Sequence, residues 1–213
     1  LGYIGKWHLE APYEPYIDCA NNRGKVAWNE WTPSNRRHGF DYWYAYNTYD
    51  FHMRPLYWDT DAGRTEFHYV DQWGPAHEAD LAIDFIRNAA KKDRGTDKPF
   101  ALVVSMNPPH TPYNLHPDKY LEPYSDMTDE ELCRRPNIPP AGTKYGDLYR
   151  KQIRHYYAMI TGVDEQVGRI MDALDEAGIA DNSILVFTSD HGNCLGIHEH
   201  ATKNVPEEES MRI

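Results

Sequence analysis

An acidic and an imidazole side chain stand next to each other in Ser189-Asp190-His191-Gly192, directly after an apolar run. A carboxylate and an imidazole at adjacent positions can ligate one divalent cation together. Gly192 permits the tight turn that would aim them at a shared ion. The alternative is that Asp190 caps a turn while His191 is merely exposed, and the tetrapeptide alone does not decide between these readings.

Lys6 and His8 are a second pair of chemically capable residues. In an extended segment, alternation places both side chains on the same side. A lysine neutralises an oxyanion, and a histidine can donate a hydrogen bond or a proton. An isolated pair of this kind is more often an ordinary surface lysine and a packed histidine.

His110 and Lys203 are single candidates. His110 lies between prolines in the segment 107–113, directly after an apolar run, and the prolines would stiffen the loop that holds it. Lys203 stands in the polar segment 203–210, which by itself indicates a solvated run of charges.

Apolar patterning predicts the elements that must position these residues. Buried strands are expected from short apolar runs, and helices from apolar residues at three- and four-residue steps. The expected strands are 1–8, 100–106 and 183–188, the helices 76–93 and 145–177, and the loops 9–75, 114–143 and 193–213. Alternating helices and buried strands predict an α/β fold with parallel strands, whose ligands sit beyond the carboxyl ends of the strands.

Composition restricts the function. The 213 residues are 40% hydrophobic, which suffices for one α/β domain. The net charge of −11 argues against a nucleic-acid partner, so an anionic substrate would need a local cluster of cations. No apolar run approaches the ~18 residues of a membrane span. Cys19, Cys133 and Cys194 form neither a zinc motif nor a disulfide framework.

The chain opens at Leu1, inside an expected strand and without an initiator methionine or a signal peptide. We therefore expect a truncated sequence. The cellular compartment stays open, and a periplasmic, secreted or lysosomal location would fit if a signal peptide once preceded Leu1.

Six segments carry a family pattern when they are read in order. They are Gly2–Leu9 (GYIGKWHL), His38–Asp41 (HGFD), Lys98–Tyr113 (KPF to PHTPY), Tyr157–Gly168 (YAMITGVDEQVG), Val186–Gly192 (VFTSDHG), and Lys203 with Glu208–Arg212 (EESMR). Together they resemble the motifs of the sulfatases of the alkaline-phosphatase superfamily. The matches follow the family order across nearly the whole chain.

The resemblance implies an alkaline-phosphatase-like α/β fold, with a mostly parallel central sheet and helices on both faces. Residues 1–213 would form a partial catalytic domain that lacks the N-terminal nucleophile segment and the C-terminal subdomain.

The resemblance also implies roles for individual residues. Lys6 and Lys203 would hold the sulfate oxygens, and His8 would orient and activate the nucleophile. His110 would contact the sulfate or protonate the leaving oxygen. Asp190, with His191, would bind the divalent metal.

The cofactors follow from the same resemblance. The metal is expected to be Ca²⁺, with Mn²⁺, Mg²⁺ or Zn²⁺ as alternatives. The nucleophile in the family is a formylglycine made from a Cys or Ser in C/S-x-P-x-R, upstream of the position of Lys6, and none of the three cysteines stands in such a motif. Two residues depart from the common pattern. His191 stands where many members have Asn and suits a softer metal than calcium, and Glu207 stands where a Tyr is frequent.

The implied function is hydrolysis of sulfate esters, either small molecules or sulfated carbohydrates, with no nucleic-acid partner and with the oligomeric state left open. One alternative is a phosphodiesterase or phosphonate monoester hydrolase of the same superfamily, in which His198 and His200 could add metal ligands. The sequence context of Lys203 favours the sulfatase. The other alternative is a non-catalytic, decayed homologue that acts as a binding protein, and the missing nucleophile segment supports it.

Overall fold

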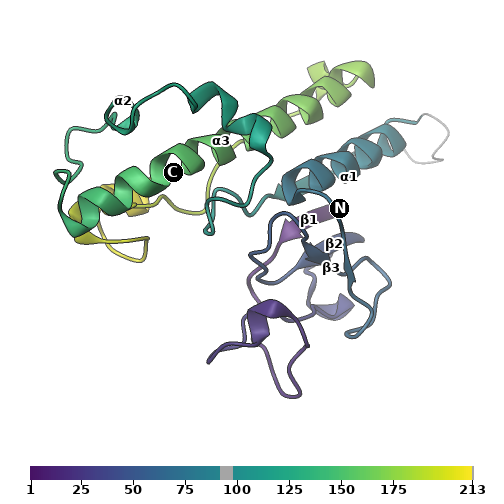
Figure 1. Cartoon of the computed structure of the whole chain (residues 1–213). Helices are drawn as coiled ribbons and strands as arrows, with labels where there is room; N and C mark the ends of the chain where they lie inside the picture. The colour runs from purple at the N-terminus through teal and green to yellow at the C-terminus, as the bar shows by residue number, and fades with distance from the viewer. Residues whose placement is uncertain (92–97, 213) are drawn as a thin grey trace. The chain divides into compact units, whose positions relative to one another are not determined.

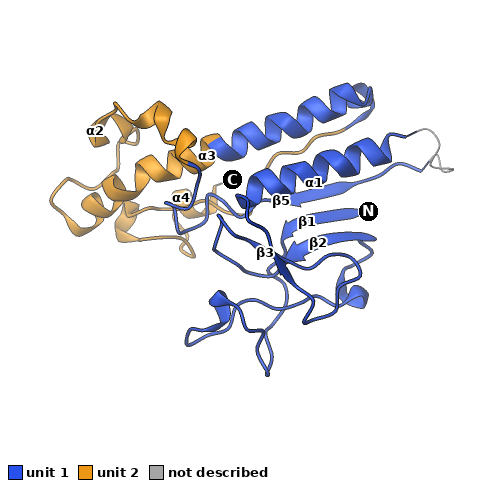
Figure 2. Cartoon of the chain, turned by 45° about the vertical axis from the view of Figure 1, so that its right-hand side comes forward, with its two compact units in different colours: residues 1–117, 162–183 blue, residues 118–161, 184–213 orange. Residues whose placement is uncertain are grey.

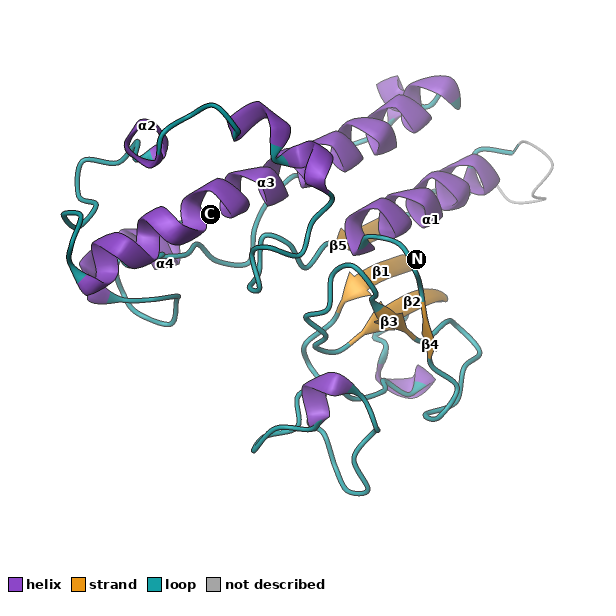
Figure 3. Ribbon diagram, viewed as in Figure 1, coloured by secondary structure: helices purple, strands orange, loops and turns teal. Residues whose placement is uncertain are grey.

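The computed structural model describes residues 1–91 and 98–212 (Figure 1). The strands are β1 (Gly2–Lys6), β2 (Tyr42–Tyr46), β3 (Leu56–Tyr57), β4 (His68–Tyr69) and β5 (Leu102–Ser105), and the α-helices are α1 (Gly74–Ala89), α2 (Asp129–Leu132), α3 (Lys144–Glu176) and α4 (Glu208–Met211) (Figure 3). Short 3₁₀ turns lie at Ala20–Asn22, Ser34–Arg36, Asp118–Tyr120, Glu122–Tyr124, Ala180–Asn182 and Ile197–Glu199.

β1, β2 and β5 form a parallel sheet in the order β2-β1-β5. The register pairs Tyr3 of the central strand with Trp43 on one side and Val103 on the other. β3 and β4 form a separate antiparallel pair. The expected α/β class with parallel strands is therefore confirmed.

Helix α1 covers one face of this sheet, and Figure 2 shows it running beside β5. Proline in its first turn suits the helix start, because the missing N–H has no partner there in any case. A Cβ atom on Gly2 would meet the ring of Phe85 in α1. The neighbouring side chain of Tyr3 points to the opposite face, where it stacks on Trp43 with a ring separation of 5.2 Å.

Gly5 lets β1 and β5 approach each other closely near their carboxyl ends. Its φ of +100° is a conformation that favours glycine, and a Cβ atom there would lie only 2.2 Å from the carbonyl oxygen of Ser105. Lys6 and the residues after Ser105 are held near each other by this approach.

The chain divides into two compact units, coloured separately in Figure 2. The first unit comprises residues 1–117 and 162–183 and contains the whole sheet and α1. The second comprises residues 118–161 and 184–213 and contains α2 and α4. Helix α3 contributes residues to both units.

The predicted strand at 183–188 is wrong. This segment has no strand structure, and Ile184 and Val186 are 95% and 79% exposed. An apolar run indicates that a segment can be buried, but a strand also needs a hydrogen-bonding neighbour. Within the part of the chain that the structure describes, residues 184–188 have none.

The other expected strands and helices are confirmed with shifted limits, whereas the loops expected at 114–143 and 193–213 contain the short helices α2 and α4. The helix expected at 145–177 is α3, the strand at 100–106 is the shorter β5, and the helix at 76–93 is α1, with residues 92 and 93 outside the described residues. β5 is only partly buried, because β1 pairs with one of its edges alone. The loop expected at 9–75 in fact contains β2, β3 and β4.

Apolar residues recur at helical steps along α3, as expected, and Tyr156, Val163 and Val167 are half-buried. Ile170 and Leu174 pack against a cluster formed by Ile83, Ile86 and Ala173. Ile160, in contrast, is 41% exposed.

No helix within residues 1–91 and 98–212 is long and apolar enough to cross a membrane.

Candidate functional site

Polar side chains meet at the carboxyl ends of the three parallel strands. Lys6 ends β1, Asp50 follows β2 and Asn107 follows β5. The Lys6 ammonium donates to Oδ1 of Asn107 over 3.0 Å. Nδ2 of Asn107 donates to the carbonyl oxygen of Tyr49 over 3.0 Å and to Oδ1 of Asp50 over 3.2 Å. Polar side chains thus gather beyond the strand ends of this unit, where parallel α/β sheets generally bind ligands.

His110 joins the same network through Asp50. Its Nδ1 lies 3.1 Å from Oδ1 of Asp50 and 2.9 Å from the carbonyl oxygen of Thr111. Asn21 donates to the other carboxylate oxygen of Asp50 over 2.9 Å. Burial alone would raise the pKa of Asp50, but the hydrogen bonds and charge of His110, followed by the bonds from Asn107 and Asn21, hold that pKa well below its usual range. Asp50 is therefore an ionised carboxylate at neutral pH.

His52 holds the backbone of His110. Nε2 of His52 lies 2.9 Å from the carbonyl oxygen of His110 and must donate to it, since a carbonyl only accepts. Burial lowers the pKa of His52 to about 4. His52 is therefore a neutral hydrogen-bond donor at neutral pH, and it adds no charge to the network.

Glu78 of α1 lies beneath the end of β1. It is 1% exposed, and the hydroxyl of Tyr57 donates to its Oε1 over 2.9 Å. That oxygen lies 3.3 Å from the position that a Cβ atom of Gly5 would occupy. Burial raises the pKa of Glu78 to about 8, so the carboxyl is protonated at neutral pH. Within the described residues, its Oε2 makes no hydrogen bond.

His8 departs from the regular alternation expected with Lys6. β1 ends at Lys6, and His8 has a φ of +57°, in the left-handed region that non-glycine residues rarely adopt. Its backbone N–H donates to the carbonyl oxygen of Asn47 over 3.0 Å, and its side chain is exposed. His8 thus lies next to the strand-end network in sequence, although it does not extend the strand.

The second unit brings Asp190, His191 and Lys203 together. Nδ1 of His191 lies 2.8 Å from the carbonyl oxygen of Gly192, so it carries the proton and donates. Its Nε2 accepts from the Lys203 ammonium over 2.8 Å and lies 3.3 Å from Oδ2 of Asp190. Three of the sequence-predicted site residues therefore share one cluster, although they come from a segment that forms no strand.

The donor chemistry of Asp190 and His191 fits a divalent cation. A ligand oxygen and a ligand nitrogen that each lie about 2.0–2.4 Å from one ion are themselves separated by roughly 3 Å. The observed 3.3 Å between Nε2 and Oδ2 agrees with that spacing. The Lys203 ammonium, itself a cation, already lies against the lone pair of Nε2. No group of three or more His, Cys, Asp or Glu residues with ligand geometry occurs within 1–91 and 98–212. These two residues would therefore supply only part of a ligand set.

His198 and His200, weighed as further metal ligands, face carboxylates of the same unit. Nε2 of His198 lies 2.8 Å from Glu209, and Nε2 of His200 lies 3.6 Å from Glu207. Each histidine thus has an acidic partner that does not depend on a metal.

Asp50 and Asn107 were not among the candidates from sequence. A signal for Asn107 existed, since it is the first polar residue after the apolar run of β5. Asp50 was hidden because β2 itself was assigned to a loop. The run Tyr42–Tyr46 is aromatic and has high strand propensity, and recognising it would have placed Asp50 just beyond a strand end.

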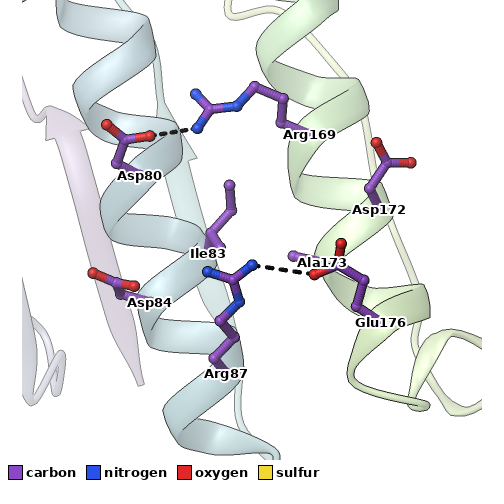
Figure 4. A pocket seen from close by; sticks show the side chains of 8 residues that line it. All are labelled: Asp80, Ile83, Asp84, Arg87, Arg169, Asp172, Ala173 and Glu176. Carbon is purple, nitrogen blue, oxygen red and sulfur yellow. Dashed lines mark hydrogen bonds and ion pairs between the residues drawn. The ribbon is translucent and has the colours of Figure 1, made fainter.

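A separate groove of about 360 Å³ lies between α1 and the part of α3 that belongs to the first unit (Figure 4). Arg169 donates to Asp80 over 2.5 Å, and Arg87 donates to Glu176 over 3.1 Å. Asp84 and Asp172 also line the groove. The groove thus holds four carboxylates and two guanidinium groups, and it offers no cluster of cations to an anionic ligand.

The parallel sheet with its covering helix, together with solved sulfatase structures that match the chain over its whole length, places the chain in the alkaline-phosphatase-like α/β class. The family model described as Sulfatase matches residues 2–213. The chain therefore belongs to the sulfatase family.

Individual relatives agree with this assignment. The chain is 36% identical to an endo-4-O-sulfatase of Bacteroides thetaiotaomicron, an alignment that covers 99% of the chain and 41% of the relative. It is 33% identical to an ulvan-active sulfatase of Formosa agariphila, with 99% and 37% covered. The chain thus spans about two fifths of the length of these relatives.

Solved structures are similar over the whole chain. A crystal structure of a Bacteroides fragilis protein named as a sulfatase has a TM-score of 0.95 and 60% identity, and the match covers 100% of this chain and 45% of that one. A structure labelled as a 4S-sulfatase, from work on glycosaminoglycan metabolism by Bacteroides thetaiotaomicron, has a TM-score of 0.83 and 34% identity, with 99% and 43% covered.

Proposed function

We propose that this chain is part of a sulfuric ester hydrolase that removes sulfate from a sulfated glycan. The observation that carries the proposal is the hydrogen-bonded network Lys6–Asn107–Asp50–His110 at the carboxyl ends of three parallel strands, in a member of the sulfatase family. Two relatives are named for action on glycans or glycosaminoglycans, which supports this substrate class.

Sulfate-ester cleavage transfers a sulfuryl group, and negative charge builds on the leaving oxygen while the sulfate oxygens stay anionic. In this proposal Lys6 and Lys203 bind the sulfate oxygens, and His110 contacts the sulfate or protonates the leaving oxygen. Removing one such preorganised partner typically costs ~3–4 kcal/mol of transition-state stabilisation. The net charge of −11 makes these local cations more necessary, because the long-range field repels an anion.

Asp190 and His191 would hold the divalent metal, most suitably Ca²⁺, with Mn²⁺, Mg²⁺ or Zn²⁺ as alternatives. Such an ion would polarise the sulfate oxygens as a Lewis acid. The Nε2 lone pair of His191, which accepts a hydrogen bond from Lys203, would bind the metal once that hydrogen bond is broken.

The nucleophile is proposed to be a formylglycine that lies outside these 213 residues, oriented by His8. Neither the three cysteines nor any serine of the chain stands in C/S-x-P-x-R. The first test is to read the coding sequence upstream of Leu1. A C/S-x-P-x-R motif preceded by an acidic pair supports the proposal, and an upstream sequence without it favours a non-catalytic homologue.

The second test is an assay of the intact enzyme with an aryl sulfate and with an aryl phosphodiester. Preferential turnover of the sulfate is expected, whereas preference for the diester would assign the protein to a phosphodiesterase. The 213-residue chain alone is expected to have negligible arylsulfatase activity. Clear metal-dependent turnover by the chain alone would contradict a nucleophile outside it.

A further inference from the structure

The proton on the ring of His110 has a defined position. Both neighbours of Nδ1, the Asp50 carboxylate and the carbonyl of Thr111, can only accept hydrogen bonds. Nδ1 must therefore carry a proton. Nε2 makes no hydrogen bond to the residues that the structure describes, and it is the nitrogen left for a substrate atom.

The Asp50 carboxylate is itself held on three sides. Asn21 and Asn107 each donate to it, and Nδ1 of His110 supplies the third bond. Its side chain is only 26% exposed. A side chain fixed at this many points transmits its orientation to the ring that it holds.

Asn107 extends this control to Lys6. Its amide donates to Asp50 and accepts from the Lys6 ammonium, and the residue is only 7% exposed. Lys6 and His110, 104 positions apart in sequence, are thus oriented through one amide and one carboxylate. Lys6, Asp50 and His110 all act electrostatically on His52, and Asp50 also acts on the buried Tyr46.

We propose that Asp50 is the positioning residue of this site. Its carboxylate keeps a proton on Nδ1 of His110 and so aims Nε2 at the leaving oxygen. Through Asn107 it also fixes the position of the Lys6 ammonium relative to the His110 ring. This inference rests on the proposed sulfatase function and assigns a role to a residue outside the sulfatase motifs.

The step itself balances as follows. The nucleophile oxygen forms a new bond to sulfur while the bond from sulfur to the leaving oxygen breaks, and the electron pair of that bond stays on the leaving oxygen. The proton on Nε2 of doubly protonated His110 passes to that oxygen, which leaves as an alcohol. His110 becomes neutral and keeps the proton on Nδ1, where Asp50 accepts its hydrogen bond.

The test uses Asp50→Asn in the intact enzyme, because a neutral amide in place of the carboxylate no longer stabilises the positively charged, doubly protonated ring of His110 that donates the proton. Two aryl sulfates are compared. 4-Nitrophenyl sulfate has a good leaving group that needs little protonation, whereas 4-methoxyphenyl sulfate has a poor one. We expect kcat to fall ~100- to 1000-fold for the poor leaving group and less than ~10-fold for the good one, with KM within ~3-fold for both.

Three controls separate positioning from damage. Asp71→Asn, at an exposed carboxylate of the same unit, should leave both rates unchanged. Asp50→Glu restores the carboxylate and should recover at least ~10-fold of the lost rate. In a His110→Ala background, Asp50→Asn should cause no further loss, because the two residues act as one unit.

Equal losses on both substrates, or no loss on either, would overturn the positioning role. ¹⁵N NMR of the histidine rings gives a readout that does not need turnover. The wild-type His110 signal should show a proton that stays on Nδ1 and a second proton that Nε2 binds as pH falls, and Asp50→Asn should require a lower pH to bind that second proton. If the wild-type enzyme hydrolyses no sulfate ester, the proposed function is wrong. The NMR result still shows in that case whether Asp50 controls the protonation of the His110 ring.

Discussion

Two segments of this chain carry similar residues after similar apolar runs, but the structure treats them differently. The segment after β5 contains Asn107, which is 7% exposed, and His110, whose ring and backbone are both hydrogen-bonded. The segment after 184–188 contains Asp190, whose side chain is 79% exposed. β5 has β1 as a neighbour, whereas 184–188 has no strand neighbour within the described residues. A strand that is paired with a neighbour therefore fixes the side chains at its end, whereas an unpaired segment leaves them exposed.

The largest expected effect concerns the two lysines. Lys6→Ala and Lys203→Ala in the intact enzyme should each lower kcat/KM ~100- to 1000-fold, because each removes one cation that we propose to bind the sulfate oxygens. Steady-state kinetics with an aryl sulfate measures both, and Lys25→Ala, at an exposed loop residue, is the control. Turnover within a few-fold of wild type would rule out the role of the lysine concerned. A loss for Lys6 alone would confine the proposed chemistry to the first unit.

The next prediction concerns the pH dependence of stability that arises from the buried carboxyl of Glu78. Because Glu78 has a pKa of about 8 in the folded protein and 4.5 as its unperturbed value, the folded state binds the extra proton between these pH values. The contribution of Glu78 to stability should therefore fall as pH rises from 5 to 7, by about 2–3 kcal/mol at ~1.4 kcal/mol per pH unit, whereas the contribution of buried, neutral His52 rises between pH 5 and 6.5. In urea unfolding of the intact enzyme, the stability difference between wild type and Glu78→Gln should follow the Glu78 slope, while the difference between wild type and Glu14→Gln, at an exposed site, should not change with pH. An unchanged slope in Glu78→Gln would mean that this carboxyl is not a buried acid.

The sequence predicts those parts of the fold and of the candidate site that depend on neighbouring residues along the chain. Helix α3 and β5 follow from apolar periodicity, and Lys6, His110 and Asp190 follow from polar residues at the ends of apolar runs. The role of Asp50 depends on a parallel pairing between segments about 40 residues apart, which no local pattern encodes.

The third prediction concerns metal binding by the more open segment. Asp190→Ala should weaken Ca²⁺ binding to the intact enzyme at least ~10-fold, measured by titration calorimetry, because it removes a carboxylate ligand. Asn107→Ser should leave the metal affinity unchanged and lower turnover, since it disturbs only the network of the first unit. If both variants lost metal affinity equally, the proposal that Asp190 binds the metal and that Asn107 does not affect it would be wrong.

The smallest effect is expected in the groove of Figure 4. Arg169 and Asp80 form a close ion pair, but their side chains are 39% and 43% exposed. A double-mutant cycle with Arg169→Ala and Asp80→Ala should give a coupling energy of at most ~1 kcal/mol. A much larger coupling in thermal or urea unfolding would show that exposed pairs, and not only the buried groups under the sheet, hold the first unit together.

The apolar residues Ile184, Leu185, Val186 and Phe187 have a consequence for handling the protein. They form an uncharged run without proline, rich in strand-forming residues, and their side chains are between 48% and 95% exposed. Such runs add readily to the same run in another copy and nucleate cross-β aggregates. The 213-residue chain expressed alone should therefore collect in inclusion bodies, and replacing Val186 with lysine should return it to the soluble fraction.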